Sequence, residues 1–200
     1  EAATAYIAIG GAGNDTFNTG TNTGMQATII GGEGTDDTLI VGNAALDLTA
    51  ASANFAISGV EVFELDATNS TMTMTATQFA NNNTVKLEGN SATADLFVVE
   101  GLATANTIDA TGVTVEATQG VGITYTGGAA NDVITGGAAD ETIAFGSAIN
   151  AGGGVDTFDG GTGTDTFDGA LVTGVTETGS AASIGAVINL GATSVTGTTV

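Results

Sequence analysis

The chain has 200 residues, of which 22 are acidic and one is basic, and its formal net charge is −21. A surface without a basic patch cannot neutralise phosphates, which argues against nucleic acids and anionic membrane surfaces as partners. The chain also contains no histidine and no cysteine, which excludes a Ser-His-Asp triad, a cysteine nucleophile, disulfides and thiolate metal sites.

The rest of the composition favours an elongated β protein. Glycine accounts for 32 residues and proline for none, and the mean hydropathy of +0.30 is too high for a disordered acidic chain. Glycine and β-branched residues weaken helices, and β-branched residues favour strands. No run of about twenty apolar residues marks a membrane span. Because the sequence lacks an initiating Met and opens inside a repeat, we expect it to be a piece of a longer protein.

The first predicted element is a strand at 6–9, which leads into the nonapeptide GGAGNDTFN at 10–18. This block matches the pattern G-G-x-G-x-D-x-U-x, in which U is a large apolar residue, at every defined position. The glycines allow positive φ and bring carbonyl oxygens close to an ion, Asp15 supplies a hard anionic oxygen, and Phe17 turns inward. We therefore predict a metal-binding turn followed by a core residue.

A second turn, GGEGTDDTL at 31–39, contains one residue too many, so that either Asp36 or Asp37 is the ligand and Leu39 is the core residue. It begins 21 residues after the first turn, which is one coil of a solenoid. We expect Asp15 and Asp36 to share a calcium site between the two coils.

From 38 to 127 the metal-binding pattern disappears, but strand-length segments recur about every ten residues between Asn, Gly, Ser and Thr clusters. They read TLIV, FAI, VEVFEL, TMTMTA, TVKLEG, DLFVVEG, NTIDA, VTVEA and GITYTG. In VEVFEL both faces are partly apolar, with Glu61 on the same face as Phe63. The Thr row of TMTMTA is expected on the solvent face of a strand, and Lys86 is expected to be a solvated charge. Because this rhythm continues into the next repeats, we favour one continuous β-solenoid over a separate sandwich or barrel.

The repeats return at 127–168, as GGAANDVIT, GGAADETIA, a break FGSAIN, then AGGGVDTFD and GGTGTDTFD. The two pairs of blocks are offset by 24 residues. This offset predicts that Asp132 lies above Asp156, and Glu141 above Asp165, in two stacked coils that share ions. The predicted core residues of these blocks are Ile134, Ile143, Phe158 and Phe167.

The acidic residues of these repeats need a counter-charge, because stacked carboxylates without a base repel one another strongly at short distances. Every available ligand is an oxygen, which favours calcium over zinc or copper, and a flexible shell of many oxygens favours calcium over magnesium. The alternatives are an acidic surface that only confers solubility and Asx turns in which each Asp binds its own backbone. The predicted metal ligands and loop glycines are Asp15, Asp36, Asp37, Asp132, Glu141, Asp156, Asp165, Gly11, Gly13, Gly32, Gly34, Gly161 and Gly163.

At these nonapeptides the sequence resembles the RTX family of calcium-dependent proteins that bacteria export by type I secretion. The wider arrangement, GNDTF, then GGEGTDDTLIV, GVEVFELDAT, long Thr/Ala/Val strands and AVINLG, resembles surface-layer and surface-filament proteins of Gram-negative bacteria. The resemblance implies a parallel β-solenoid that orders and assembles with calcium outside the cell. The departures are Ala130 and Ala139 in place of a glycine, Glu141 in place of the ligand Asp, and the extra Asp37.

We therefore expect a parallel β-solenoid with calcium-binding repeats at 1–45 and 127–169, a solenoid without ligand motifs at 46–126, and a continuation or linker at 170–200. The expected function is structural and not enzymatic: calcium-dependent self-assembly into a surface layer or extracellular filament at the cell surface. The expected partner is a second copy of the chain, through the solenoid ends and calcium bridges, and cell-surface polysaccharide is a further candidate. The alternatives are the spacer region of an adhesin and the secretion module of a secreted enzyme. A glycosidase pair such as Asp36 and Asp37 is disfavoured, because Trp is absent and Tyr occurs only twice.

Overall fold

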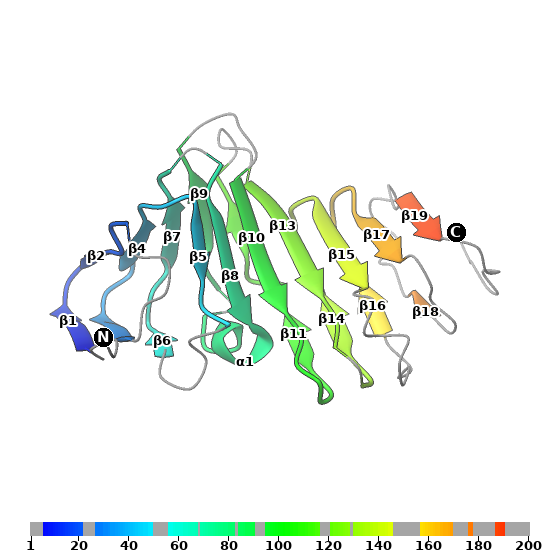
Figure 1. Ribbon diagram of the computed structural model, residues 1–200, viewed down its shortest axis with the longest axis horizontal. Helices are drawn as coiled ribbons and strands as arrows, with labels where there is room; N and C mark the ends of the chain where they lie inside the picture. Colours follow the sequence, from blue (N-terminus) through cyan, green and yellow to red (C-terminus); the bar gives the residue numbers. More distant parts are fainter. Residues whose placement is uncertain are drawn as a thin grey trace.

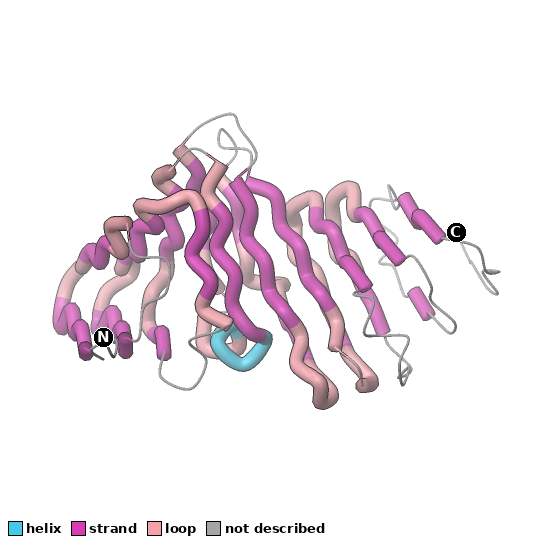
Figure 2. The backbone as a smooth tube through the Cα atoms, viewed as in Figure 1, coloured by secondary structure: helices cyan, strands magenta, loops and turns pink. Residues whose placement is uncertain are grey.

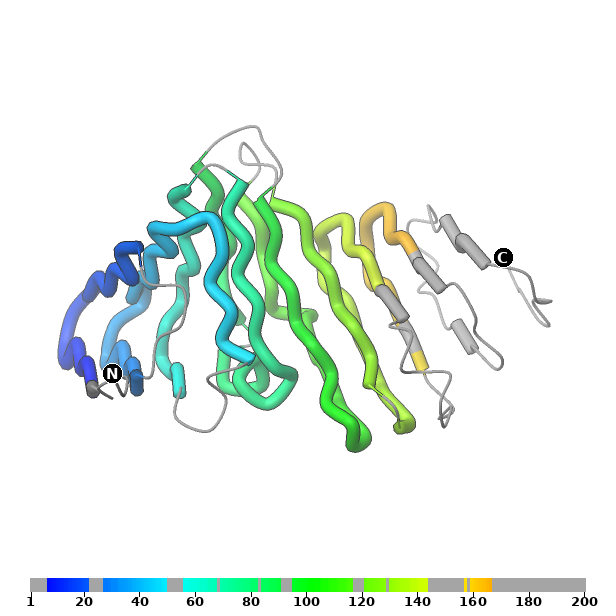
Figure 3. Tube along the Cα trace, viewed as in Figure 1, coloured from blue at the N-terminus to red at the C-terminus, as the bar shows by residue number. Residues whose placement is uncertain are grey.

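The computed structural model shows a parallel β-solenoid whose coils succeed one another along the long axis of the molecule (Figure 1). The coils advance with the sequence along this axis, from blue near the N-terminus through green to orange (Figure 3). The structure describes residues 6–21, 27–49, 56–67, 69–82, 84–90, 95–116, 121–128, 130–145, 157–169, 176–177 and 187–190. Among these residues, no helix has the length and apolar character that crossing a bilayer requires.

The strands form four sheets, and every strand pair between the described residues is parallel. The first sheet contains β1 (Tyr6–Ala12), β3 (Ala27–Glu33) and β6 (Ala56–Ser58). The second contains β2 (Thr16–Asn18), β4 (Thr38–Val41), β7 (Val62–Leu65), β9 (Lys86–Gly89) and β12 (Thr114–Val115).

The third sheet contains β5 (Ala45–Asp47), β8 (Thr71–Thr75), β10 (Asp95–Glu100), β13 (Val121–Thr126), β15 (Glu141–Phe145), β17 (Thr166–Gly169) and β19 (Val187–Leu190). The fourth contains β11 (Thr107–Asp109), β14 (Val133–Thr135), β16 (Thr157–Asp159) and β18 (Thr176–Glu177). We call β1 and β2 the first coil, β3 to β5 the second, and β6 to β8 the third.

Alternation along each strand places every second side chain inside the solenoid, where equivalent residues of successive coils stack. Phe17 pairs with Leu39, Leu39 with Phe63 and Phe63 with Leu87. Leu39, Phe63 and Leu87 are fully buried, and Phe17, on the first coil, is half-buried. The predicted core positions Ile134 and Ile143 are also fully buried. The side chains of Phe158 and Phe167 lie outside the described part of the structure.

The middle coils, which we define as residues 62–126, are filled by aromatic rings. The ring centroids of Phe63 and Phe97 lie 5.9 Å apart, those of Phe79 and Phe97 6.1 Å, and those of Phe79 and Tyr125 6.2 Å. All four side chains have at most 1% of their surface exposed. Tilted aromatic pairs at such separations add attraction beyond the burial of their area.

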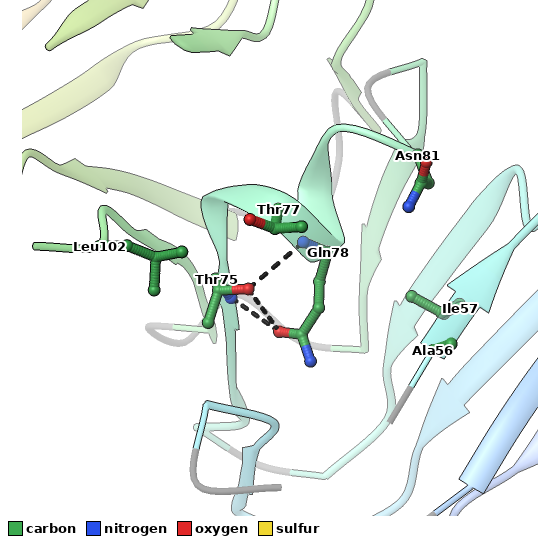
Figure 4. A pocket seen from close by; sticks show the side chains of 7 residues that line it. All are labelled: Ala56, Ile57, Thr75, Thr77, Gln78, Asn81 and Leu102. Atoms are coloured by element: carbon green, nitrogen blue, oxygen red, sulfur yellow. Dashed lines mark hydrogen bonds between the residues drawn. The ribbon is translucent and has the colours of Figure 1, made fainter. Parts of the chain in front are cut away.

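One short helix, α1 (Ala76–Phe79), interrupts the strands of the described chain (Figure 2). Thr75 and Gln78 form a capping box: the Thr75 N–H donates to Gln78 Oε1 at 2.8 Å, and the Gln78 N–H donates to Thr75 Oγ1 at 3.3 Å (Figure 4). The predicted solvent row at 71–75 is therefore only partly correct, because Thr75 is buried and caps the helix. The sequence did not predict α1, since four residues are too few to show a helical period.

The preference for a solenoid over a sandwich is confirmed, and each strand-length segment predicted between 38 and 127 overlaps an observed strand. The strand predicted at 6–9 is longer than expected, because β1 continues through the paired glycines that follow it. The one strand between 38 and 127 that was not predicted is β5, whose three residues lie in an Ala-rich segment.

Candidate functional site

An acidic residue stands at the start of many strands, either just before the first strand residue or, at Asp95 and Glu141, as that residue. Two positions later comes a large apolar residue, and alternation places both on the inner face of the strand. The pattern recurs in Asp15-Thr16-Phe17, Asp37-Thr38-Leu39, Glu61-Val62-Phe63, Asp95-Leu96-Phe97, Asp132-Val133-Ile134, Glu141-Thr142-Ile143 and Asp165-Thr166-Phe167. Five of these acids, Asp37, Asp95, Asp132, Glu141 and Asp165, are at most 7% exposed.

In five of these acids, one carboxylate oxygen accepts the backbone N–H of the equivalent residue in the preceding coil; they are Asp37, Glu61, Asp95, Asp132 and Asp165. Asp37 Oδ1 accepts from Asp15 at 2.8 Å, and Asp165 Oδ1 accepts from Glu141 at 3.1 Å. Glu141 instead accepts the N–H of Gly137, in its own turn, at 3.2 Å. The five acids therefore join neighbouring coils at the corners where these strands begin.

The other oxygen is without a hydrogen-bond donor at four of these corners. Asp15 Oδ2, Asp37 Oδ2, Asp95 Oδ2 and Glu141 Oε2 are buried, and no described residue donates to them. Asp132 is different, because its Oδ2 accepts the Gly128 N–H at 2.6 Å while its Oδ1 accepts from Asn106. An ionised carboxylate that is buried with an unsatisfied oxygen costs several kcal/mol unless a cation or a proton compensates it.

The only basic side chain of the protein lies elsewhere. Lys86 Nζ is 2.6 Å from Glu88 Oε1 and 2.5 Å from Glu116 Oε2, on the outer face of the second sheet. Those two glutamates raise the pKa of Lys86, Glu116 more than Glu88. The expectation of a solvated charge is therefore correct in part, because Lys86 is partly exposed but is also paired with two glutamates. The corner acids have no basic partner in the sequence.

Gly10, Gly31 and Gly136 have no side chain at the places towards which three of these unsatisfied oxygens point, those of Asp15, Asp37 and Glu141. A Cβ on Gly10 would overlap both Asp15 Oδ2 and the carbonyl oxygen of Gly31 in the next coil. A Cβ on Gly136 would lie 2.9 Å from Glu141 Oε2 and would overlap the Gly160 carbonyl oxygen. At each position a carboxylate oxygen and a carbonyl oxygen of the following coil therefore converge on one small space. We call these arrangements the acidic corners.

The second glycine of each predicted turn has another role. Gly11 and Gly32 have φ values of +109° and +118°, and a Cβ on Gly32 would overlap the Gly11 carbonyl oxygen. A larger residue would be strained in this conformation and would push the coils apart. Gly13, Gly161 and Gly163 also have positive φ, whereas Gly34 lies against the carboxylate of Asp37.

The structure corrects the expected pairing of the first two turns. Thr16 pairs with Thr38, so Asp37 lies above Asp15, and the extra residue of the second turn is Asp36. Asp36 is exposed, and its Oδ2 accepts from Asn14 Nδ2 at 3.4 Å. Sequence spacing could not decide between the two, because an extra loop residue can stand on either side of the turn.

The predicted offset of 24 residues in the second block is confirmed, since Thr142 pairs with Thr166 and Val133 with Thr157. Glu141 is therefore stacked on Asp165. Burial and, to a smaller extent, the adjacent Asp165 carboxyl group together raise the pKa of Glu141 to about 8, against the lowering effect of the Gly137 N–H. The expected partner of Asp132, Asp156, lies outside the described residues.

The donor set fits calcium better than it fits a metal held by side chains alone. In the described part of the chain, no three Asp, Glu, His or Cys side chains gather as a metal-binding group. A cation at an acidic corner would instead combine one or two carboxylates with backbone carbonyls. Calcium accepts six to eight oxygen ligands of this kind in flexible geometry.

Sequence reasoning missed Asp95 and Glu61, which occupy equivalent corners without the paired glycines. The signal that could have found them is the acid-x-apolar pattern at a strand start, which does not depend on the glycines. At Asp95 the surroundings differ, because a Cβ on Gly89 would lie 2.7 Å from Asp95 Oδ2 but 3.0 Å from a methyl group of Val121. The converging carbonyl is replaced by an apolar group, so this corner is a poor cation site.

A cavity of about 350 Å³ lies beside α1 and is lined by residues that include Ile57, Thr77, Asn81 and Leu102 (Figure 4). All of its lining side chains are uncharged, and none is a histidine or cysteine, so it offers no metal-binding or acid-base group. No family model matches the chain, and the searches of curated proteins and of solved structures also find no significant match. The candidate site therefore rests on the geometry of the acidic corners.

Proposed function

We propose that this chain is a calcium-stabilised β-solenoid of an extracellular structural protein that self-assembles into a surface layer or filament. The observation that supports the proposal most directly is the set of buried corner carboxylates whose free oxygens converge with glycine carbonyls and have no basic partner. A protein that is negative at almost every ionisable position needs cations to bring its coils together.

Calcium would act here as the counter-charge between successive coils. Asp15, Asp37, Glu141 and Asp165 would bind it together with the carbonyl oxygens of the neighbouring glycines. Bound calcium supplies positive charge and coordination to oxygens that the chain itself leaves unsatisfied. Because only the folded coil brings these oxygens together, binding would stabilise the fold by mass action.

Calcium dependence also suits a protein that works outside the cell. Extracellular calcium modules bind at roughly 0.1 to 1 mM, so such sites would be empty in a cytosol and filled outside. Folding would then accompany export, as the resemblance to type I-secreted proteins implies.

Self-assembly is supported by the exposed surface of the first coil. Among the described large apolar residues Ile7 and Ile9 are the most exposed, at 70% and 66%, and both lie on β1, an outer strand of its sheet. Large apolar side chains that are exposed on a strand are suited to contact another copy of the chain.

The proposal is tested with the purified chain, by adding calcium after dialysis against a chelator. We expect calcium, and not equimolar magnesium, to increase the β signal in circular dichroism and to produce ordered assemblies in electron microscopy. Identical spectra with and without calcium would contradict the proposal.

A pair of variants separates assembly from calcium binding. Ile9→Asp adds a charge to the exposed face of β1, and Thr16→Asp adds the same charge to an exposed position of β2. We expect Ile9→Asp to keep the calcium response in circular dichroism but to remain monomeric, while Thr16→Asp assembles. Calcium-dependent folding without assembly in the unmodified chain would favour the adhesin spacer or the secretion module.

A further inference from the structure

The third coil repeats the geometry of an acidic corner in a stretch that lacks the paired glycines. Residues 58–63 read SGVEVF and do not match the nonapeptide. Nevertheless, the pairing of Ile30 with Ser58 places Gly59 above Gly31, and the pairing of Thr38 with Val62 places Glu61 above Asp37. Asp37 in the second coil therefore has an acidic residue, Glu61, above it, just as Asp15 in the first coil has Asp37 above it.

Backbone contacts between these two corners are tight. The Asp37 N–H donates to Glu61 Oε2 at 2.9 Å, and the Glu61 N–H donates to the Asp37 carbonyl oxygen at 2.9 Å. One coil earlier, the Asp15 N–H donates to Asp37 Oδ1 at 2.8 Å. Asp15, Asp37 and Glu61 therefore form a continuous column of three carboxylates along the solenoid.

The middle acid of this column has an oxygen that these contacts do not satisfy. Asp37 is 0% exposed, and no described residue donates a hydrogen bond to its Oδ2. This oxygen points to the space above Gly31, where a Cβ would lie 2.5 Å away and would overlap the Gly59 carbonyl oxygen. Gly59 has a φ of +60°, a conformation that favours glycine, in the turn that directs its carbonyl towards this space.

We infer that Asp37, Glu61 and the Gly59 carbonyl oxygen form a second divalent-cation site, between the second and third coils. The inference rests on the proposed function for the chemistry of the ion, and adds a site to it. A cation between Asp15 and Asp37 leaves the charge of Glu61 uncompensated, and one more cation in the same column neutralises it. The N-terminal coils then bind two stacked ions, and the second of them uses Gly59 and Glu61, which lie outside the nonapeptides.

The test compares calcium binding by Glu61→Gln and Glu64→Gln in the full chain. Glutamine keeps an oxygen that accepts the Asp37 N–H but removes the charge. Glu64 lies on β7, the strand that follows Glu61, with its side chain on the outer face. By isothermal titration with calcium alone, we expect Glu61→Gln to lose one bound ion or to bind it at least about tenfold more weakly, since affinity follows ligand charge. Glu64→Gln should bind as the unmodified chain does.

This titration distinguishes a failure of the proposed function from a failure of the cation site at Glu61. If the unmodified chain binds no calcium, both are overturned. If it binds calcium and the two variants titrate identically to it, only the site at Glu61 is overturned.

A second measurement on the unmodified chain removes any dependence on the folding of a variant. In amide-resolved NMR, the N–H of Val60 follows the Gly59 carbonyl, so coordination of that carbonyl by calcium should shift its resonance. We expect this shift to saturate with the calcium-dependent shift of Asp37. An unmoved Val60 resonance in a chain whose Asp37 resonance shifts would overturn the site.

Discussion

The acidic corners and the middle coils keep their coils together by different physical means. At the corners of Asp15, Asp37 and Glu141, a buried carboxylate oxygen and a glycine carbonyl converge, and no base is present. In the middle coils, Phe63, Phe97 and their neighbours fill the interior. The corners therefore depend on something that the chain does not supply, whereas the middle coils are stabilised by their own side chains.

The difference shows how one solenoid can combine coils that are stable without a ligand with corners whose stability depends on neutralisation of their charge. Burial of apolar surface stabilises the middle coils both with and without calcium, because it needs no ligand. The acidic corners gain stability only when their charge is neutralised. If this comparison is correct, a core substitution and the removal of calcium should affect separate parts of the molecule.

The largest effect is expected from Phe97→Ala in the middle coils. Phe97 contacts the rings of both Phe63 and Phe79 and is fully buried, so the substitution leaves a cavity and should cost about 3–5 kcal/mol of unfolding free energy. Denaturant unfolding in saturating calcium measures this loss. The control is Leu96→Ala, whose side chain lies on the outer face of the same strand and should cost about 1 kcal/mol or less. Similar losses for both variants would show that the interior of the middle coils is not the stabilising element.

Much of this architecture follows from the sequence because the repeats specify their own spacing. The offset of 24 residues predicts that Glu141 stacks on Asp165, and the register confirms it. The strands were predictable because alternating β-branched and apolar residues stand between short turn clusters.

The remaining features depend on contacts that no local pattern specifies. Whether Asp36 or Asp37 faces inward depends on the register between two coils, which one extra loop residue leaves undecided. Glu61 and Asp95 lack the paired glycines, so their corners can be recognised only when the register between neighbouring coils is known. The partners of Lys86 also come from two different coils, and one of them, Glu116, is 30 residues away in sequence.

The next largest effect is expected from removal of calcium, which should destabilise the acidic corners but not the middle coils. At a calcium concentration of about 100 times Kd, an ion that binds only the folded state contributes about 2.7 kcal/mol, or roughly a hundredfold in exchange protection. We expect the amide hydrogens of Asp15, Asp37 and Glu141, which lie at the corners, to lose this protection in chelator. The amide of Phe97 should remain protected. Uniform loss of protection over both regions would show that the solenoid unfolds as one unit.

A smaller effect is expected from pH in the calcium-free chain. The folded pKa of Glu141, about 8, is raised above its ordinary value of 4.5, so the folded state binds this proton more tightly than the unfolded state. The resulting stability is fully present below pH 4.5 and is lost as the pH rises through about 8. Thermal unfolding between these limits should show the decline, and Glu141→Gln should flatten it. Asp140→Asn, which removes a neighbouring exposed charge, is the control; an equal flattening there would assign the effect to net charge.

The smallest effect is expected from Lys86→Gln, which removes the only base of the protein. Lys86 is partly exposed, and pairs of this kind contribute little because water and salt screen them. The substitution leaves Glu88 and Glu116 close together on the outer face, so any loss of stability should shrink as salt is added. The number of calcium ions bound, measured by titration, should stay the same, because the acidic corners lie on the inner face. A lower number of bound ions in this variant would mean that the outer glutamates and the corners share their cations, and the separation of the two regions would fail.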